Sequence, residues 1–184
     1  MSRIAVIVGS LRKESLNRKI ALSVAKLAPP VLEMSLVEIG SLPLYNEDLE
    51  ADPPSQWTIF RDRVRASDAV LFVTPEYNRG VPGGLKNAID VGSRPYGRSV
   101  WDKKPVAVIS VSPGAIGGYG ANHALRQSFV FLDMPAMQQP EAYIGGAAKL
   151  FDADGGIANT ATLQFLEGFV KAFASWVASH STRQ

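Results

Sequence analysis

The sequence predicts an α/β fold, a three-layer α/β/α sandwich around a five-stranded parallel sheet. Short apolar runs alternate with segments of helical periodicity along the chain, which is the pattern of strands joined by crossover helices. Two of these runs, residues 69–73 and 105–111, are almost continuously apolar, as strands covered on both faces are. Connections of this kind are right-handed and place helices against the sheet. The length of 184 residues suits a single domain over residues 1–184.

The first part of the chain supplies an expected strand, helix and second strand. Residues 4–8 are apolar and rich in β-branched side chains, which is typical of a buried strand. Apolar residues recur at helical spacing over 16–27, and the pair of prolines that follows ends this helix. Residues 32–39 mix apolar and polar side chains, as an edge strand does. The polar loop at 40–54 is expected to be solvated.

The rest of the chain repeats the alternation of helix and strand. Trp57, Phe60 and Val64 lie at helical spacing and predict a helix through about Ser67. The remaining elements are expected at these positions: strands at 69–73, at 105–111 and from 136–139 toward Ile144, and helices from about Pro82, over 121–132 and over 158–179.

The turn after the first strand concentrates groups that bind anions. Ser10, Ser15 and Asn17 offer hydroxyl and amide donors. Arg12 adds a planar guanidinium that matches phosphate oxygens. The loop also leads into a helix, whose first N–H groups have no partner within the helix. We interpret the loop as a phosphate site; an ordinary helix cap with a solvated arginine is the alternative.

The sequence of this loop excludes several classes of phosphate ligand. It lacks the G-x-x-x-x-G-K-[ST] and G-x-G-x-x-G patterns, so it is neither a triphosphate loop nor the usual dinucleotide turn. It also holds no cysteine or aspartate that could act as a phosphatase nucleophile. A phosphate monoester used as a handle fits better. An FMN-like mononucleotide in a flavodoxin-like sheet, bound where the strand order reverses, is the natural candidate.

Two further loops follow predicted strands. The loop at 74–90 contains two prolines and three glycines, and the loop at 112–120 is glycine-rich. Such residues fix irregular backbone that can approach a flat ligand closely. Because parallel strands end at one edge of the sheet, all three loops are expected to meet there.

Composition excludes several classes of function. The formal net charge is +2 and no run of like charge occurs, which argues against a nucleic-acid partner. The chain has no cysteine, so redox chemistry must come from a cofactor. His123 and His180 lack acidic neighbours at ligand spacing, so no metal site is expected. No apolar segment approaches the length that spans a bilayer, and we expect a cytoplasmic protein without a membrane partner.

The loops carry a family resemblance. The patterns Gly9-Ser10-x-Arg12-x-x-Ser15-x-Asn17 and Pro75-Glu76-Tyr77-Asn78, with the stretch 82–90, resemble the NAD(P)H-dependent FMN reductases. The bacterial quinone and chromate reductase branch is the most similar. The resemblance implies a flavodoxin-like fold and non-covalent FMN, with NADH or NADPH as co-substrate. It implies that these residues bind FMN: Ser10, Arg12, Ser15, Leu16, Asn17, Pro75, Glu76, Tyr77, Asn78, Ser112 and Gly114.

The resemblance also implies a mechanism. The flavin accepts hydride at N5 and passes electrons to a second substrate, so ping-pong reduction of quinones needs no catalytic side chain. Chromate and other metal oxyanions are further candidate acceptors. Arg79, Arg94 and Gly117 are expected to contact substrate. Arg98 and Lys86 are weaker candidates, for which a solvated surface charge is an equal alternative.

Relatives of this kind form homodimers or homotetramers in which a neighbouring subunit helps to close the flavin pocket. This chain has Arg79 where an aromatic residue is common, and Tyr119-Gly120 where a basic residue is common. The stretch 81–85 and Trp101 are candidate oligomer contacts, with core packing as the alternative. Two alternative functions are a flavodoxin-like electron carrier and an FMN or azo-dye reductase. A phosphate-ligand binder without redox activity would leave residues 75–78 without a role.

Overall fold

A computed structural model of the chain describes residues 1–181. Five parallel strands form one sheet in the order β2-β1-β3-β4-β5. This order is that of flavodoxin-like sheets, so the predicted fold class is confirmed. The strands are β1 (Ser2–Val8), β2 (Leu32–Leu36), β3 (Ala69–Thr74), β4 (Val106–Val111) and β5 (Ala142–Ile144).

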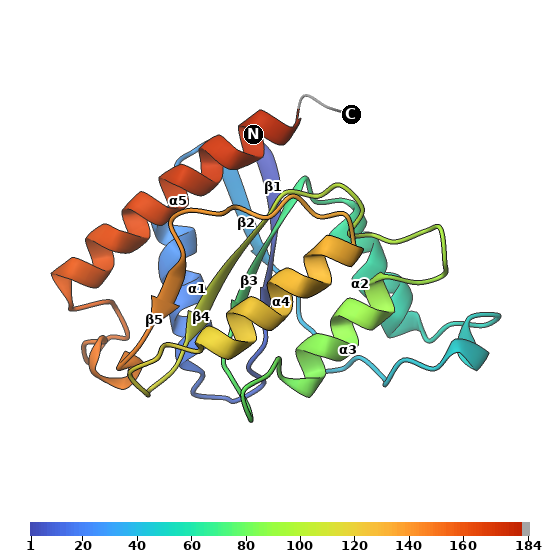
Figure 1. Cartoon of the computed structure of the whole chain (residues 1–184), viewed down its shortest axis with the longest axis horizontal. Helices are drawn as coiled ribbons and strands as arrows, with labels where there is room; N and C mark the ends of the chain where they lie inside the picture. The colour runs from blue at the N-terminus through green and yellow to red at the C-terminus, as the bar shows by residue number, and fades with distance from the viewer. Residues whose placement is uncertain (182–184) are drawn as a thin grey trace.

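Helices cover both faces of the sheet (Figure 1). The helices α1 and α5 lie on one face, and α2, α3 and α4 lie on the other. Their bounds are α1 (Leu16–Leu27), α2 (Ser55–Arg65), α3 (Gly83–Gly92), α4 (Tyr119–Phe131) and α5 (Thr160–Ser181), with short 3₁₀ turns η1 (Glu47–Leu49) and η2 (Ala147–Lys149). Among the described residues, none of the helices is both long and apolar enough to cross a bilayer.

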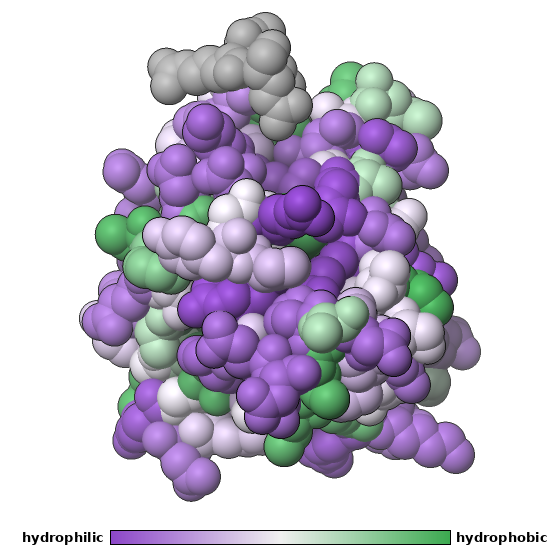
Figure 2. Space-filling model, turned by 90° about the vertical axis from the view of Figure 1, so that its right-hand side faces the viewer, coloured by the Kyte–Doolittle hydropathy of each residue, from purple (hydrophilic) through white to green (hydrophobic). Residues whose placement is uncertain are grey.

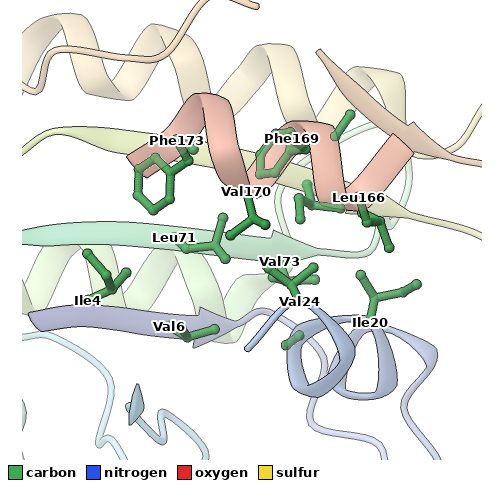
Figure 3. Close-up of a cluster of buried hydrophobic side chains, with 14 of the residues drawn as sticks. Ile4, Val6, Ile20, Val24, Leu71, Val73, Leu166, Phe169, Val170 and Phe173 are labelled. Atoms are coloured by element: carbon green, nitrogen blue, oxygen red, sulfur yellow. The ribbon is translucent and has the colours of Figure 1, made fainter. Parts of the chain in front are cut away.

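The core consists of two apolar layers, one on each side of the sheet. In the first layer, Val170 and Phe173 of α5 point toward Leu71 of β3 (Figure 3), and Phe169 belongs to the same buried cluster. All four side chains are buried, and each contributes about 1.5–3 kcal/mol of hydrophobic free energy. The period of 3.6 residues in α5 is therefore the sequence signal of this layer.

The second layer contains a cluster of aromatic side chains. Trp101 is fully buried, with its ring centroid 5.8 Å from that of Phe72 and 6.0 Å from that of Phe60. Its indole N–H donates to the carbonyl of Ile89 at 3.0 Å. The hypothesis that Trp101 is an oligomer contact is therefore wrong. Outside this layer, the side that shows α2, α3 and the loop around η1 is mostly hydrophilic (Figure 2).

Two predicted strands are shorter than expected. The strand predicted at 32–39 ends at Leu36, although the N–H of Val37 still donates to Val6 at 2.9 Å. The strand predicted from 136 makes only an isolated bridge between Ala136 and Val106, and β5 starts six residues later. Prolines at 135 and 140 lack the N–H that a continuous ladder needs.

The loop at 40–54 is docked on α2 and α3, so the prediction of a solvated loop is wrong for part of it. The side chain of Asn87 accepts from the N–H of Tyr45 at 2.8 Å and donates to the carbonyl of Pro43 at 3.0 Å. The ring of Tyr45 stacks on Trp57 with centroids 5.3 Å apart. These contacts satisfy backbone groups that water would otherwise have to satisfy.

Candidate functional site

The loops that follow β1, β3 and β4 meet at the carboxyl end of the sheet, as predicted. The N–H of Gly9 donates to the carbonyl of Val73 at 2.9 Å. A Cβ on Gly9 would lie 2.9 Å from Leu85 and 3.0 Å from the hydroxyl of Thr74, so only glycine permits this approach. A cavity of about 240 Å³ opens there, lined by Ser10, Arg12, Ser15, Leu16, Asn17, Pro75, Glu76, Tyr77, Val111, Ser112 and Pro113.

One wall of the cavity is the N-terminus of α1. Ser15 caps this helix, and its Oγ accepts from the N–H of Arg18 at 3.1 Å. The hydroxyl hydrogen of Ser15 therefore remains available to a ligand. The N–H groups of Leu16 and Asn17 lie in the first turn, where no helical partner exists, and that turn contains no acidic residue. This end of α1 is suited to an anion.

Arg12, which also lines the cavity, has no ion-pair partner among the described residues. Its side chain is exposed, and within residues 1–181 no carboxylate lies in ion-pair distance of it. Arg18 differs, because it pairs with Glu38 at 2.6 Å and its hydrogen bond lowers the pKa of that carboxyl. An unpaired guanidinium beside an anion-binding helix end is free to bind a phosphate.

Asn17 carries a buried polar atom that needs a partner. Only 5% of this residue is exposed, and its Oδ1 makes no hydrogen bond to the described part of the chain. The two ends of an amide are assigned from the hydrogen-bond network, so either end can face the cavity. A buried amide without a protein partner is typical of a residue whose partner is a ligand or water.

The β3 loop contributes a tight turn after its lining residues. Tyr77 and Gly80 exchange two backbone hydrogen bonds of 3.2 and 3.0 Å. The two residues between them, Asn78 and Arg79, have φ angles of +51° and +63°, as in a type I′ turn. Tyr77 is 47% exposed at the cavity, while the predicted ligand Asn78 lies in the turn beside the lining residues.

The β4 loop closes the third side. Ser112 lines the cavity, and its Oγ accepts from the N–H of Gly114 at 3.1 Å. Gly114 itself does not line the cavity; its carbonyl accepts from Gly117 at 3.4 Å and Gly146 at 3.1 Å. Sequence reasoning missed the lining residues Val111 and Pro113, whose only signal is that they flank Ser112.

Two residues predicted to contact substrate, Gly117 and Arg94, are not among the residues that line the cavity. Gly117 has a φ of +64°, and a Cβ there would lie 2.7 Å from the backbone carbon of Tyr143, so it shapes the loop. Arg94 follows the far end of α3 and lines a separate hollow with Tyr96 and Phe131. Helix α3 begins near the cavity, and its ten residues carry the chain about 15 Å away.

The remaining ionisable side chains of the described residues form no metal site. Within residues 1–181, no group of three or more His, Cys, Asp or Glu side chains could hold a metal ion. The Nε2 of His123 lies 2.9 Å from the hydroxyl of Tyr143. Burial, and next a hydrogen bond with Glu141, raise the pKa of Tyr143 to about 12. Lys86 pairs with Asp90 at 2.7 Å on the surface of α3.

The fold defines a flavodoxin-like protein, and the cavity at the carboxyl end of its sheet adjoins a helix N-terminus that is suited to an anion. Residues 2–149 match the family described as NADPH-dependent FMN reductase. The chain belongs to this family, as its loops predict. The family description pairs NADPH with FMN, in agreement with the predicted cofactor and co-substrate.

Similar proteins extend over nearly the whole chain. A quinone reductase from Pseudomonas putida is 69% identical over 175 residues, which are 95% of this chain and 94% of the relative. A 2-hydroxy-1,4-benzoquinone reductase from a Burkholderia species is 45% identical, over 95% of this chain and 96% of the relative. The solved structure of FerB, a flavoenzyme NAD(P)H:(acceptor) oxidoreductase from Paracoccus denitrificans, has a TM-score of 0.92 and 48% identity, and the match covers 98% of this chain and 99% of that one.

The residues present fit FMN. The unpaired Arg12, the Ser15 hydroxyl and the free N–H groups of α1 are the donors that a phosphate monoester requires. The unpartnered amide of Asn17 and the exposed ring of Tyr77 lie on the same cavity. A phosphate at one end and a flat ring system beside Tyr77 would satisfy both sets of groups.

Proposed function

We propose that this protein is an FMN-dependent NAD(P)H oxidoreductase that reduces quinones. The observation that carries the proposal is the cavity at the carboxyl end of the sheet, where the N-terminus of α1 and the unpaired Arg12 adjoin an open face beside Tyr77. The names of the relatives from Pseudomonas putida and Burkholderia support a quinone as the acceptor.

The protein residues bind and orient, and none is required as an acid or base. Ser10, Arg12, Ser15 and Asn17 hold the phosphate of FMN, with the backbone N–H of Leu16. The segment 75–77 and Ser112 place the ring system. When bound, FMN supplies hydride acceptance from NAD(P)H and delivery of two electrons to the acceptor, in ping-pong order. Fixed donors around the site favour the negative charge that reduction adds.

Acceptors reach the site past Tyr77 and Arg79. Tyr77 offers a half-exposed aromatic face for a flat, apolar quinone. The guanidinium of Arg79 is 76% exposed and lies 3.6 Å from the carboxylate of Glu76, so a solvent-facing cation remains for anionic acceptors. Chromate and other metal oxyanions are therefore included in the proposal. Contact of Arg94 or Gly117 with substrate, a homodimer or homotetramer, and a cytoplasmic location stay predictions.

One assay tests the proposal. Purified protein reconstituted with FMN is mixed with NADH or NADPH and, in separate arms, with a quinone, free FMN, an azo dye or chromate. We expect turnover with a quinone and no added partner protein. Cofactor reduction without turnover of any acceptor indicates an electron carrier, and a colourless protein that does not retain FMN overturns the proposal. Faster turnover of free FMN or the dye identifies the alternative reductases.

A further inference from the structure

Glu76 lines the cavity, and its side chain reaches the start of α4. Its Oε2 accepts from the backbone N–H of Ala121 at 3.1 Å. Ala121 is the third residue of α4, and its N–H is one of the groups that a helix cannot satisfy internally. Glu76 thus acts as an N-terminal cap supplied from a loop that lies 45 residues away in sequence.

Helix α4 has no cap of its own. Its N-cap position is Gly118, with no side-chain hydrogen bond, and its first turn contains no acidic residue. A carboxylate at this end interacts favourably with the helix dipole. The Glu76 side chain is only 14% exposed and has Arg79 at 3.6 Å on its other oxygen. The carboxylate is therefore held between a helix end and a cation.

The helix is shaped to admit this carboxylate. A Cβ on Gly120 would lie 2.9 Å from Oε2 of Glu76 and 2.9 Å from the carbonyl oxygen of Arg79. Any larger residue at position 120 would displace the β3 loop from α4. The absence of a side chain at Gly120 and the reach of Glu76 are thus complementary features of one contact.

We propose that Glu76 is a positioning residue, whose capping of α4 holds the β3 loop in the shape that binds FMN. Pro75, Glu76 and Tyr77 line the cavity, and the turn that follows contains two residues with positive φ. Such a segment keeps its conformation only when its surroundings fix it. The contact with Ala121 joins the β3 loop to the first turn of α4, the helix that follows the β4 loop. The inference rests on the proposed binding of FMN.

Two substitutions of Glu76 separate the effect of its hydrogen bond to Ala121 from the effect of its negative charge. Glu76→Ala removes the cap, and we expect the FMN dissociation constant to rise about tenfold and the melting temperature of the apoprotein to fall. Glu76→Gln keeps an acceptor oxygen, so we expect it to retain FMN within about threefold of the wild type. FMN affinity is measured by flavin fluorescence. An equal loss in both variants overturns the proposal, because the hydrogen bond would then not matter.

A second pair of variants tests the contact from the helix side. Gly120→Ala inserts a Cβ against Glu76, whereas Gly83→Ala, in the first turn of α3, meets no atom within 4 Å. Both changes raise helix propensity. We expect Gly120→Ala to weaken FMN binding about tenfold and Gly83→Ala to leave it unchanged. Unchanged FMN affinity in both Glu76→Ala and Gly120→Ala refutes the positioning role, whereas a wild-type protein without FMN affinity refutes the proposed function itself.

Discussion

The guanidinium of Arg61 and the carboxylate of Glu50 form an ion pair of 2.6 Å, with only 7% and 16% of the two side chains exposed. The Nε of Arg61 also donates to the carbonyl of Val91 at 2.9 Å, and the guanidinium lies 5.5 Å from the ring centroid of Trp57. One arginine thus ties the loop at 40–54 to both α2 and α3.

Removal of the Glu50 carboxylate should therefore destabilise the folded protein. Glu50→Ala leaves the charge of Arg61 buried without a counter-ion, and we expect the free energy of unfolding to fall by about 3 kcal/mol. Asp62→Ala is the control, because Asp62 pairs with Arg65 at the surface with 64% and 55% of the side chains exposed; there we expect at most about 0.5 kcal/mol. Chemical denaturation measures both. Equal losses would contradict the role assigned to burial.

Arg12 should contribute to FMN binding and little to folding. Its guanidinium is exposed and has no ion pair within the described residues. We expect Arg12→Ala to raise the FMN dissociation constant by a factor of about 10 to 100, as loss of charge-assisted hydrogen bonds does, with no change in apoprotein melting temperature. Lys13→Ala, at the neighbouring exposed cation, should leave FMN affinity near that of the wild type. An unchanged FMN affinity in Arg12→Ala would exclude it as a phosphate ligand.

Two buried asparagines should respond in opposite ways. The Oδ1 of Asn17 has no partner among the described residues, whereas the amide of Asn87 binds Tyr45 and Pro43. Asn17→Ala should raise apoprotein stability by up to about 1 kcal/mol because it removes a polar atom without a partner, while weakening FMN binding. Asn87→Ala should lower apoprotein stability by about 1–3 kcal/mol. Thermal unfolding without FMN distinguishes them, and similar destabilisation by both would show that Asn17 is satisfied in the apoprotein.

The fold could be predicted because alternation of apolar runs and helical periodicity is a local signal. The boundary that failed at 136–141 depends on backbone donors. Apolar character at Ala136 and Met137 cannot reveal that prolines interrupt the ladder on either side. The loop at 40–54 was misjudged for a related reason, since its burial depends on Asn87, which is 42 residues from its partner Tyr45.

The candidate site likewise has a part that the sequence predicts and a part that it does not. The residues of the β1 loop were predictable because anion donors cluster in sequence directly before a helix. The contact of Glu76 with Ala121 was not, because it exists only when two separate strands bring their loops together. Arg94 is predicted as a cation near the site, yet it follows the end of α3 and lines a separate hollow.

Because the pKa of Tyr143 is raised in the folded protein, we expect the protein to lose stability in alkaline solution. Burial raises its pKa from 10.0 to about 12 in the folded protein. The unfolded chain therefore loses this proton at lower pH than the folded chain, and stability falls as the pH rises from 10 to 12. Tyr143→Phe should make this decline shallower, whereas Tyr96→Phe, at a residue 88% exposed, is the matched control. Denaturation across this pH range, with tyrosinate absorbance, tests the assignment; an equal decline in Tyr143→Phe and the wild type would contradict it.

Arg79 combines backbone strain with a charge, and two substitutions separate them. Its φ of +63° costs a residue with a side chain about 1–2 kcal/mol, a cost that glycine avoids. The ion pair with Glu76 contributes little, because the Arg79 side chain is 76% exposed. Arg79→Gly should therefore unfold at a higher temperature than Arg79→Ala, which keeps the strain.

Kinetics should not distinguish the two variants, because both substitutions remove the same guanidinium. Each should raise the Michaelis constant for anionic acceptors such as chromate by a similar factor, and raise it less for neutral quinones. Equal effects on neutral and anionic acceptors would remove Arg79 from the acceptor path. If the two variants instead differ in their Michaelis constants, the conformation of the turn, and not the charge that it carries, governs access to the site.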